Sequence, residues 1–330
     1  MVLKRVLALS VIAMVAMGLT ACERKITRIE LASGPLTCAQ CHDGSNVITG
    51  KQAEWSMSLH GTGTTYEEEG GNPSCAGCHS GHAFQVRIAA GQAPNQVTQG
   101  DTDPTPMDCR ACHMIHDTYT MQDFALQTTA PVAFYAITGK TFDGGKGNLC
   151  ANCHQPRRDA PVASNGTITG ISSHWGPHHG PQSSMLMGLA GAGVTSVAAG
   201  HYQGVSGTCV TCHMGDGANH TMEPNVATCK KCHTAATNFD VDGVQTEIAA
   251  LGDSLGDYLV AAGLIDQNNS DGHPTVTSAP EARGRALWNW LYVMHEDKSL
   301  GVHNPAYARA MLQYGISVFT ATGPEVAAKQ

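Results

Sequence analysis

The sequence is poor in aromatic and charged side chains. Aromatic residues make up 5% of the 330 residues and charged residues 14%, whereas an ordinary soluble domain has roughly 25% charged residues. Side chains alone would therefore build a poor core. Glycine and proline are plentiful instead, at 37 and 15 residues, and they favour loops over long regular elements. We expect a loop-rich fold in which something other than side chains fills the interior.

Basic tracts are also missing, and the apolar segments are short. The formal net charge is −8, which argues against nucleic acid as a partner. The apolar run at residues 6–18 is 13 residues long, too short to span a bilayer. It follows Lys4 and Arg5 and ends in small residues. This pattern predicts a secretory signal peptide at 1–21.

The end of this leader carries a short motif. The string LTAC at residues 19–22 resembles a bacterial lipobox, in which the cysteine becomes the lipidated first residue. The resemblance implies a lipid anchor on Cys22, followed by a tether at 22–34. Glu23 follows, and the absence of Asp there implies sorting to the outer membrane in such lipoproteins. The chain is expected to be exported and anchored at the periplasmic or cell-surface face of that membrane.

Twelve of the 13 cysteines fall into six C-x-x-C-H motifs, and the thirteenth is Cys22. No cysteine remains for a disulfide framework or a free nucleophile. The spacing suits covalent haem attachment, because two thiols add to one porphyrin edge and the adjacent histidine reaches the iron from one face. The predicted attachment residues are Cys38, Cys41, His42, Cys75, Cys78, His79, Cys109, Cys112, His113, Cys150, Cys153, His154, Cys209, Cys212, His213, Cys229, Cys232 and His233.

Zinc binding and dithiol redox chemistry are the competing interpretations of these motifs. A zinc ribbon also uses C-x-x-C pairs, but it needs no histidine directly after every second cysteine. With 17 histidines in 330 positions, chance would place one after all six pairs with a probability of order 10⁻⁸. We predict six covalent c-type haems, whose macrocycles replace the packing that aromatic side chains would otherwise supply.

Eleven further histidines could place a second ligand on every iron. His82 and His116 each lie three residues after a motif histidine, and the macrocycle prevents either from reaching the far face of its own haem. Each would bind a neighbouring iron, so that one short peptide holds two haems. The predicted second ligands are His60, His82, His116, His178, His201 and His220, with His174 and His179 as alternatives to His178.

The remaining histidines are expected to have structural roles. His273 precedes Pro274 in a predicted loop. His295 and His303 lie in a predicted helical segment, where packing or capping is expected, although iron ligation by His303 stays open. Two histidine ligands give an iron a lower potential than histidine with methionine.

The motifs have no fixed period, since their first cysteines are separated by 37, 34, 41, 59 and 20 residues. The predicted fold is mainly α-helical and irregular, a multihaem array wrapped by loops and short helices. The six-haem region is placed at 35–235 and a haem-free helical segment at 236–330. Apolar periodicity predicts a helix over 244–264. A capping box at 278–281 predicts a helix to about 296, and Asn304 with Pro305 predicts one to about 320.

Several strings resemble the multihaem c-type cytochromes of metal-reducing bacteria. They are WGPHHGPQ at 175–182, CVTCHM with a following HTMEP at 209–224, CRACHMIHD at 109–117 and GVHNPAYARAML at 301–312. In that group such strings accompany low-potential haems with two histidine ligands, which pass electrons across the periplasm or cell surface. The resemblance implies a hexahaem lipoprotein in respiratory or extracellular electron transfer. Its implied partners are other cytochromes, a membrane electron conduit or metal oxides.

Two other functions stay open. A reductase of nitrite, hydroxylamine, a sulfur oxyanion or a metal would need one iron without a second ligand, and 174–179 is where we would expect it. The similar pentahaem nitrite reductases have lysine in place of one motif histidine, whereas all six motifs here end in histidine. A subunit of an extracellular cytochrome filament would receive a histidine from a neighbouring chain, but a lipid anchor argues against this. The leading prediction is an electron carrier and not an enzyme.

Overall fold

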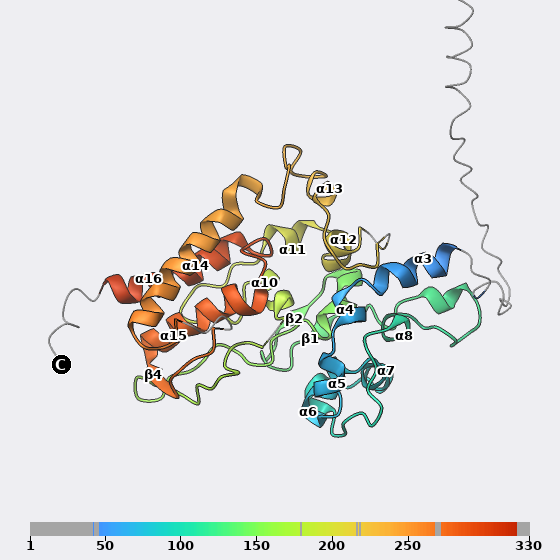
Figure 1. Cartoon of the computed structure of the whole chain (residues 1–330), viewed down its shortest axis with the longest axis horizontal. Coiled ribbons are helices and arrows are strands. Elements are labelled where there is room, and N and C mark those ends of the chain that lie inside the picture. Colours follow the sequence, from blue (N-terminus) through green and yellow to red (C-terminus); the bar gives the residue numbers. More distant parts are fainter. Residues whose placement is uncertain are drawn as a thin grey trace, which may run out of the picture.

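The computed structural model describes residues 42, 46–178, 180–215, 217, 219–267 and 272–321. The predicted signal peptide, Cys22 and the tether lie outside these described residues, as do Cys38, Cys41 and His179. The fold is mainly helical and irregular with very short strands, which confirms the predicted fold class (Figure 1). In the described part of the chain, no helix is both long and apolar enough to cross a membrane.

Short helices joined by loops form the part of the molecule that carries the motifs. The α-helices there are α3 (Asn46–Trp55), α4 (Leu59–Thr62), α5 (Thr65–Glu69), α6 (Pro73–His79), α7 (Gly81–Ala89), α8 (Cys109–Cys112), α9 (Asn148–Ala151), α10 (Gln182–Met187), α11 (Gly200–Gly204), α12 (Cys209–His213) and α13 (Val226–Cys229). Single 3-10 turns are η1 (Pro94–Gln96), η2 (Met121–Phe124), η3 (Gly145–Gly147) and η4 (Val241–Gly243). Strands β1 (Val132–Ala133) and β2 (Thr141–Phe142) form one antiparallel pair.

The five described C-x-x-C pairs each begin on one of these short helices. A single helical turn brings positions i and i+3 to the same face, so both thiols of a motif share one side. Three of the motif helices have side-chain caps that fix where they begin. Asn72 accepts a hydrogen bond from the backbone of Ser74, Asp108 from Arg110 and Ala111, and Asn225 from Ala227. The local sequence therefore fixes the start of three motif helices without any long-range contact.

Three longer helices pack together at the other end of the molecule (Figure 1). They are α14 (Val244–Ala261), α15 (Glu281–Trp290), which continues as the π-helical η5 (Leu291–Asp297), and α16 (Pro305–Thr320). The helix predicted from residue 244 is confirmed as α14. The cap at Asn304 is also confirmed, because its side chain accepts a hydrogen bond from the backbone of Tyr307 at 3.2 Å.

The predicted capping box at 278–281 is wrong. Residues Ser278–Pro280 form strand β4, which pairs with strand β3 (Thr167–Thr169), and α15 begins only at Glu281. No side chain caps α15. The extended backbone that β3 requires of these residues takes the place of the local cap.

The core of the helical end extends into the central loops. Ile248, Leu255 and Leu287 are fully buried between the helices. Trp288 is also buried, donates its indole N–H to the carbonyl of Ala190 at 2.7 Å, and meets the ring of Trp175 edge-on at 5.1 Å. These contacts fix the central loops at Trp175 and Ala190 against the C-terminal helices.

Candidate functional site

Each of the six motif histidines faces a second histidine. The two rings of a pair come from segments distant in sequence, and the six pairs use twelve different histidines. The ring centres are 6.1 Å apart in the pairs His42–His116 and His79–His178, and 6.2 Å apart in the pairs His113–His220, His154–His60, His213–His303 and His233–His201. The fold thus repeats one local geometry at every motif.

This separation fits two imidazoles on opposite faces of one metal ion. A metal–nitrogen bond of about 2 Å on each side, with about 1 Å from each nitrogen to its ring centre, puts the centres about 6 Å apart. Two motif thiols lie within four residues of each motif histidine. The donor set of each pair and its C-x-x-C therefore fits a covalently attached haem iron with two histidine ligands.

Hydrogen bonds to the protein orient several of these rings. Each uses the Nδ1 atom, which leaves Nε2 as the nitrogen available to a metal. The partners are the carbonyl of Phe124 for His113 at 2.8 Å, the side-chain oxygen of Gln182 for His154 at 2.9 Å, the carbonyl of Val302 for His201 at 2.9 Å and the carbonyl of Met222 for His213 at 2.9 Å. Such contacts fix both the tautomer and the direction of a ligating ring.

Burial keeps four of the opposed rings neutral. It lowers the pKa of His60 to about 4, and the neighbouring His154 adds to the effect. Burial is also the main cause that lowers the pKa of His154, His213 and His220. Metal ligation needs the free lone pair of a neutral imidazole. These rings are therefore in the form that can bind iron at neutral pH.

Five predicted second ligands lie opposite motif histidines, namely His60, His116, His178, His201 and His220. The predicted sharing of one short peptide by two pairs is seen at residues 113–116. His113 faces His220, while His116 faces His42 at the first motif. These two pairs are consequently held at a short, fixed separation.

His82 lies elsewhere. Its side chain is 62% exposed, and its Nδ1 is 3.2 Å from a carboxylate oxygen of Asp101. The hydroxyl of Ser80 caps α7 by accepting a hydrogen bond from the backbone of Ala83, so His82 sits in the first turn of a helix. The structure brings it to no motif histidine among the described residues. The ring that lies opposite the remaining motif histidine, His213, is that of His303.

His303 is the ring that sequence reasoning placed among packing or capping residues. It directly precedes the cap residue Asn304, whose amide donates to the carbonyls of Met185 at 3.0 Å and Val197 at 2.7 Å. These bonds tie the start of α16 to the central loops and direct His303 toward His213. The available signal was the Asn304 cap itself, because it fixes the position of the residue before it.

Two of the opposed histidines have a backbone conformation that is uncommon for residues other than glycine. The φ angle is 67° at His116 and 86° at His178, a conformation that costs of the order of 1–3 kcal/mol and needs support from its surroundings. At His116 the support is the carboxylate of Asp123. It accepts hydrogen bonds from the backbone N–H groups of His116, Thr118 and Tyr119 at 2.9, 2.7 and 3.1 Å. The loop is built around this carboxylate and aims His116 at His42.

The motif at 150–154 lies between other motifs. The thiol of Cys78 donates a hydrogen bond to the carbonyl of Asn152 at 3.9 Å. On the other side, the thiol of Cys209 donates to the carbonyl of Gly147 at 4.0 Å, and the hydroxyl of Thr208 donates to the carbonyl of Gly144 at 3.1 Å. The motifs at 75–79 and 209–213 therefore flank the motif at 150–154 on two sides.

A further pair of rings, His174 and His273, has centres 6.0 Å apart, but neither residue belongs to a C-x-x-C-H motif.

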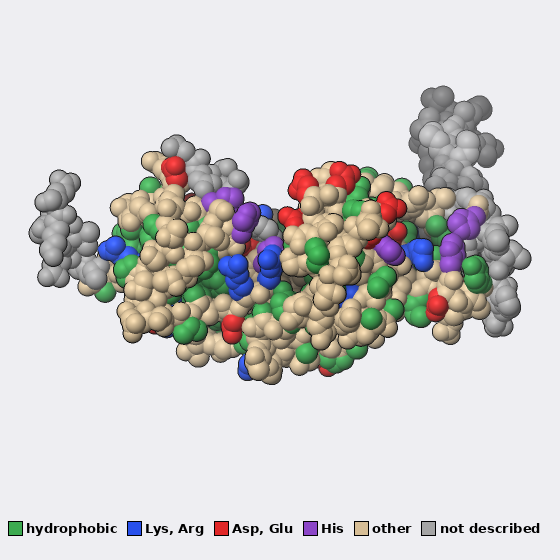
Figure 2. All heavy atoms as spheres, turned by 90° about the horizontal axis from the view of Figure 1, so that it is seen from below, with side chains coloured by type: hydrophobic (Ala, Val, Ile, Leu, Met, Phe, Trp, Pro, Cys, Tyr) green, Lys and Arg blue, Asp and Glu red, His purple; other side chains and the backbone are tan. Residues whose placement is uncertain are grey.

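In the described part of the chain, no cluster of three or more His, Cys, Asp and Glu side chains could hold a metal ion. Figure 2 shows histidines reaching one face of the molecule at several places along its length, with acidic side chains gathered over one part of it.

The comparisons with known proteins support the class of fold. A similar architecture occurs in a cytochrome, for the chain superposes on a solved structure with a TM-score of 0.50 and 23% identity. That structure is the crystal structure of the outer cell wall cytochrome OcwA, and the match covers 82% of this chain and 50% of that one. The chain spans about half the length of this neighbour. No family model and no curated protein matches the sequence.

Proposed function

We propose that the protein is an electron-transfer cytochrome with six covalent c-type haems, each iron held between two histidines. One observation carries this proposal. Every motif histidine has a second histidine opposite it, with ring centres 6.1–6.2 Å apart, and this separation suits one iron between the two rings. The fold shared with an outer cell wall cytochrome supports it. When bound, the haems supply one-electron redox chemistry, and the chain supplies their positions, ligands and burial.

The contacts between motifs support conduction through the molecule. The hydrogen bonds of Cys78 to Asn152 and of Cys209 to Gly147 hold three attachment sites side by side. The peptide 113–116 links the pairs that contain His42 and His113. Electrons would pass between neighbouring haems across these contacts, with no substrate pocket required.

The same geometry favours a carrier over the two alternatives. A reductase would need an iron with one open face, yet in the region expected to hold it, His178 faces His79. A filament subunit would take a ligand from another chain, whereas here each motif histidine has its partner within the same chain.

We also propose that the protein is exported, anchored by a lipid on Cys22 to the outer membrane, and active in respiratory or extracellular electron transfer. The leader and the LTAC string support the anchor. The envelope location named for the structural neighbour supports a site outside the cytoplasm. Other cytochromes, a membrane electron conduit or metal oxides would exchange electrons with it. The net charge of −8 favours basic docking surfaces on such partners.

Counting the haems and their spin states tests the proposal. A pyridine haemochrome assay of purified protein should give six c-type haems per chain, and electron paramagnetic resonance of the oxidised protein should show only low-spin iron. Cyanide should change nothing. One high-spin haem that binds cyanide would favour the reductase, and fewer than six haems would contradict the ligand set.

A matched pair of variants tests the sixth ligand. His303→Ala should convert one haem of six from low-spin to high-spin, because His213 would lose the ring opposite it. His82→Ala should leave all six low-spin, because His82 contacts Asp101. The reverse result would restore His82 as the ligand and remove His303.

A further inference from the structure

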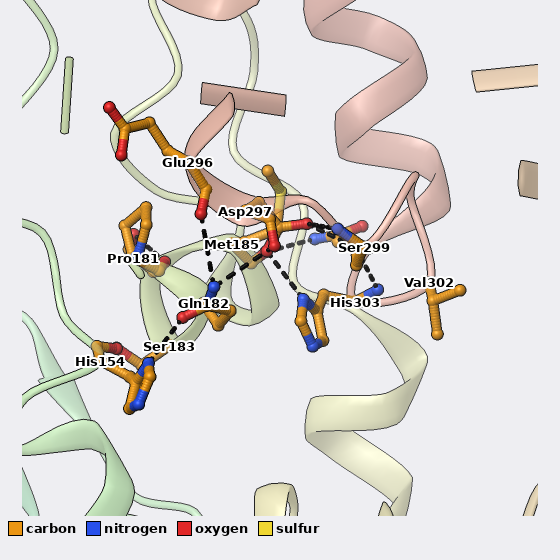
Figure 3. Close-up of polar contacts among 12 residues, drawn as sticks. His154, Pro181, Gln182, Ser183, Met185, Glu296, Asp297, Ser299, Val302 and His303 are labelled. Atoms are coloured by element: carbon orange, nitrogen blue, oxygen red, sulfur yellow. Dashed lines mark hydrogen bonds and ion pairs between the residues drawn. The ribbon is translucent and has the colours of Figure 1, made fainter. Parts of the chain in front are cut away.

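A chain of hydrogen-bonded polar groups connects two of the opposed pairs (Figure 3). The side-chain oxygen of Gln182 accepts a hydrogen bond from Nδ1 of His154 at 2.9 Å. The amide nitrogen of Gln182 donates to the carbonyls of Glu296 at 3.4 Å and Asp297 at 3.3 Å. The carboxylate of Asp297 then accepts a hydrogen bond from Nδ1 of His303 at 2.7 Å. One motif ring is therefore held by a neutral amide, and the ligand ring of a neighbouring pair by a carboxylate.

Asp297 is built into the structure at the end of η5. Its side chain is 1% exposed. One carboxylate oxygen faces His303, while the other accepts hydrogen bonds from the hydroxyl and the backbone N–H of Ser299. Ser299 in turn accepts from the backbone N–H of His303 at 3.2 Å. The carboxylate and the ring are thus held in one fixed orientation.

This arrangement differs from that of four other opposed histidines. The Nδ1 atoms of His113, His154, His201 and His213 have neutral oxygens as partners. Glu54 lies 3.9 Å from Nδ1 of His220, beyond hydrogen-bond distance, and is one-third exposed. A carboxylate bonded to the outer nitrogen of a ligand makes the ring a stronger donor to the metal. A buried negative charge also favours the more positive, oxidised iron.

We propose that Asp297 gives the iron between His213 and His303 a lower reduction potential than the iron between His154 and His60. The proposal rests on the proposed function, since it concerns haems bound at these pairs. Asp297 acts through His303 and is a positioning residue. Hydrogen bonds from Thr208 and Cys209 to the carbonyls of Gly144 and Gly147 bring the two motifs together. Because electrons pass from lower to higher potential, transfer from the Asp297 side to the Gln182 side is downhill.

Asp297→Asn tests the proposal, because it removes the charge and keeps the size of the side chain. In a spectroelectrochemical titration of the full protein, one haem of six should shift to higher potential. At a fixed applied potential its ratio of reduced to oxidised iron should rise about tenfold, which is about 59 mV for one electron. The electron paramagnetic resonance signal of one low-spin haem should shift with it. Ser299→Ala, which keeps the carboxylate, should change the potential much less.

Gln182→Glu is the converse variant. It places a carboxylate on His154 and should lower the potential of one haem. If the Asp297→Asn protein does not accumulate, Gln182→Glu alone tests the proposal. An unchanged potential of the haem at His154 then overturns it. Six low-spin haems with potentials unaffected by Asp297→Asn would overturn it while leaving the proposed function intact. A wild-type protein without six low-spin haems would instead contradict the proposed function itself.

Discussion

The two ends of the molecule differ in what is buried inside them. Within described residues 46–130, the buried hydrophobic side chains are Ala76, Phe84 and Ala111. The helices from residue 244 onward bury a continuous core, which includes Ile248 and Leu255. Buried apolar surface contributes roughly 25 cal/mol per Å², so the first region gains little from its own side chains. Under the proposed function, attached haem forms part of the core at one end, whereas packed helices form the core at the other.

The largest effect is expected from removing one attachment site. Cys150→Ser with Cys153→Ser should lower the haem count from six to five. Because this motif lies between two others, the spectra of neighbouring haems should change as well, and protease should cut the region before residue 235 more readily. Haem content per protein and limited proteolysis measure both effects. Unchanged proteolysis would show that this end is stable without the haem.

Trp288→Ala makes the corresponding change at the helical end. The substitution removes a buried indole and its hydrogen bond to Ala190, and large-to-small changes of this kind cost about 3–5 kcal/mol. Denaturant unfolding followed by far-ultraviolet circular dichroism measures the loss. The haem count should stay at six. A drop in haem count would mean that the helical end must form before the haems can attach.

Replacing one helical glycine by alanine at each end should change the stability of the protein in opposite directions. A Cβ at Gly315 in α16 would lie 2.4 Å from a methyl carbon of Leu255, whereas nothing lies within 4 Å of a Cβ at Gly50 in α3. Gly315→Ala should destabilise the protein by about 1–3 kcal/mol through overpacking. Gly50→Ala should stabilise α3 by about 0.5–1 kcal/mol. Thermal unfolding measures the change in melting temperature of each variant. A change in the same direction for both would contradict the difference in packing.

The smallest effect concerns an ion pair on the helical end. Arg309 donates two hydrogen bonds to Glu247, at 2.6 and 2.5 Å, and this lowers the pKa of the Glu247 carboxyl. A lowered pKa gives stability that is present above the unfolded value of 4.5 and is lost as the pH falls through the folded value. Glu247→Gln should therefore reduce stability slightly at pH 7, and the difference from the wild type should shrink as the pH falls below 4.5. A loss that does not change with pH would show that the charge is not the cause.

Local signals in the sequence predict the local features of the site. The C-x-x-C-H motifs define the first histidine of each pair, and the Asn304–Pro305 cap predicts α16. His82 and His116 both lie three residues after a motif histidine, so this spacing did not distinguish them. The neighbouring residues differ. Ser80 starts a helix that turns His82 outward, whereas Asp123 holds the loop that turns His116 inward. A serine two residues before His82 was the readable sign of that helix.

Long-range pairing is what the sequence could not supply. The capping box at 278–281 is locally plausible, but its residues pair with β3, more than 100 residues earlier. His303 meets His213 because the cap of α16 is bonded to Met185 and Val197. The free energy of such contacts depends on the assembled fold, so the sequence identified five of the six opposed histidines and missed His303.

The order of the paired histidines along the chain has a consequence for biogenesis. Four partners follow their motif histidine, and His303 follows His213 by 90 residues. In a polypeptide that leaves the cytoplasm N-terminus first, the last motif is delivered while the partner of His213 has yet to emerge. The start of α16 is then the last part of these pairs to be delivered, and a chain that ended before it would leave His213 without the histidine that lies opposite it.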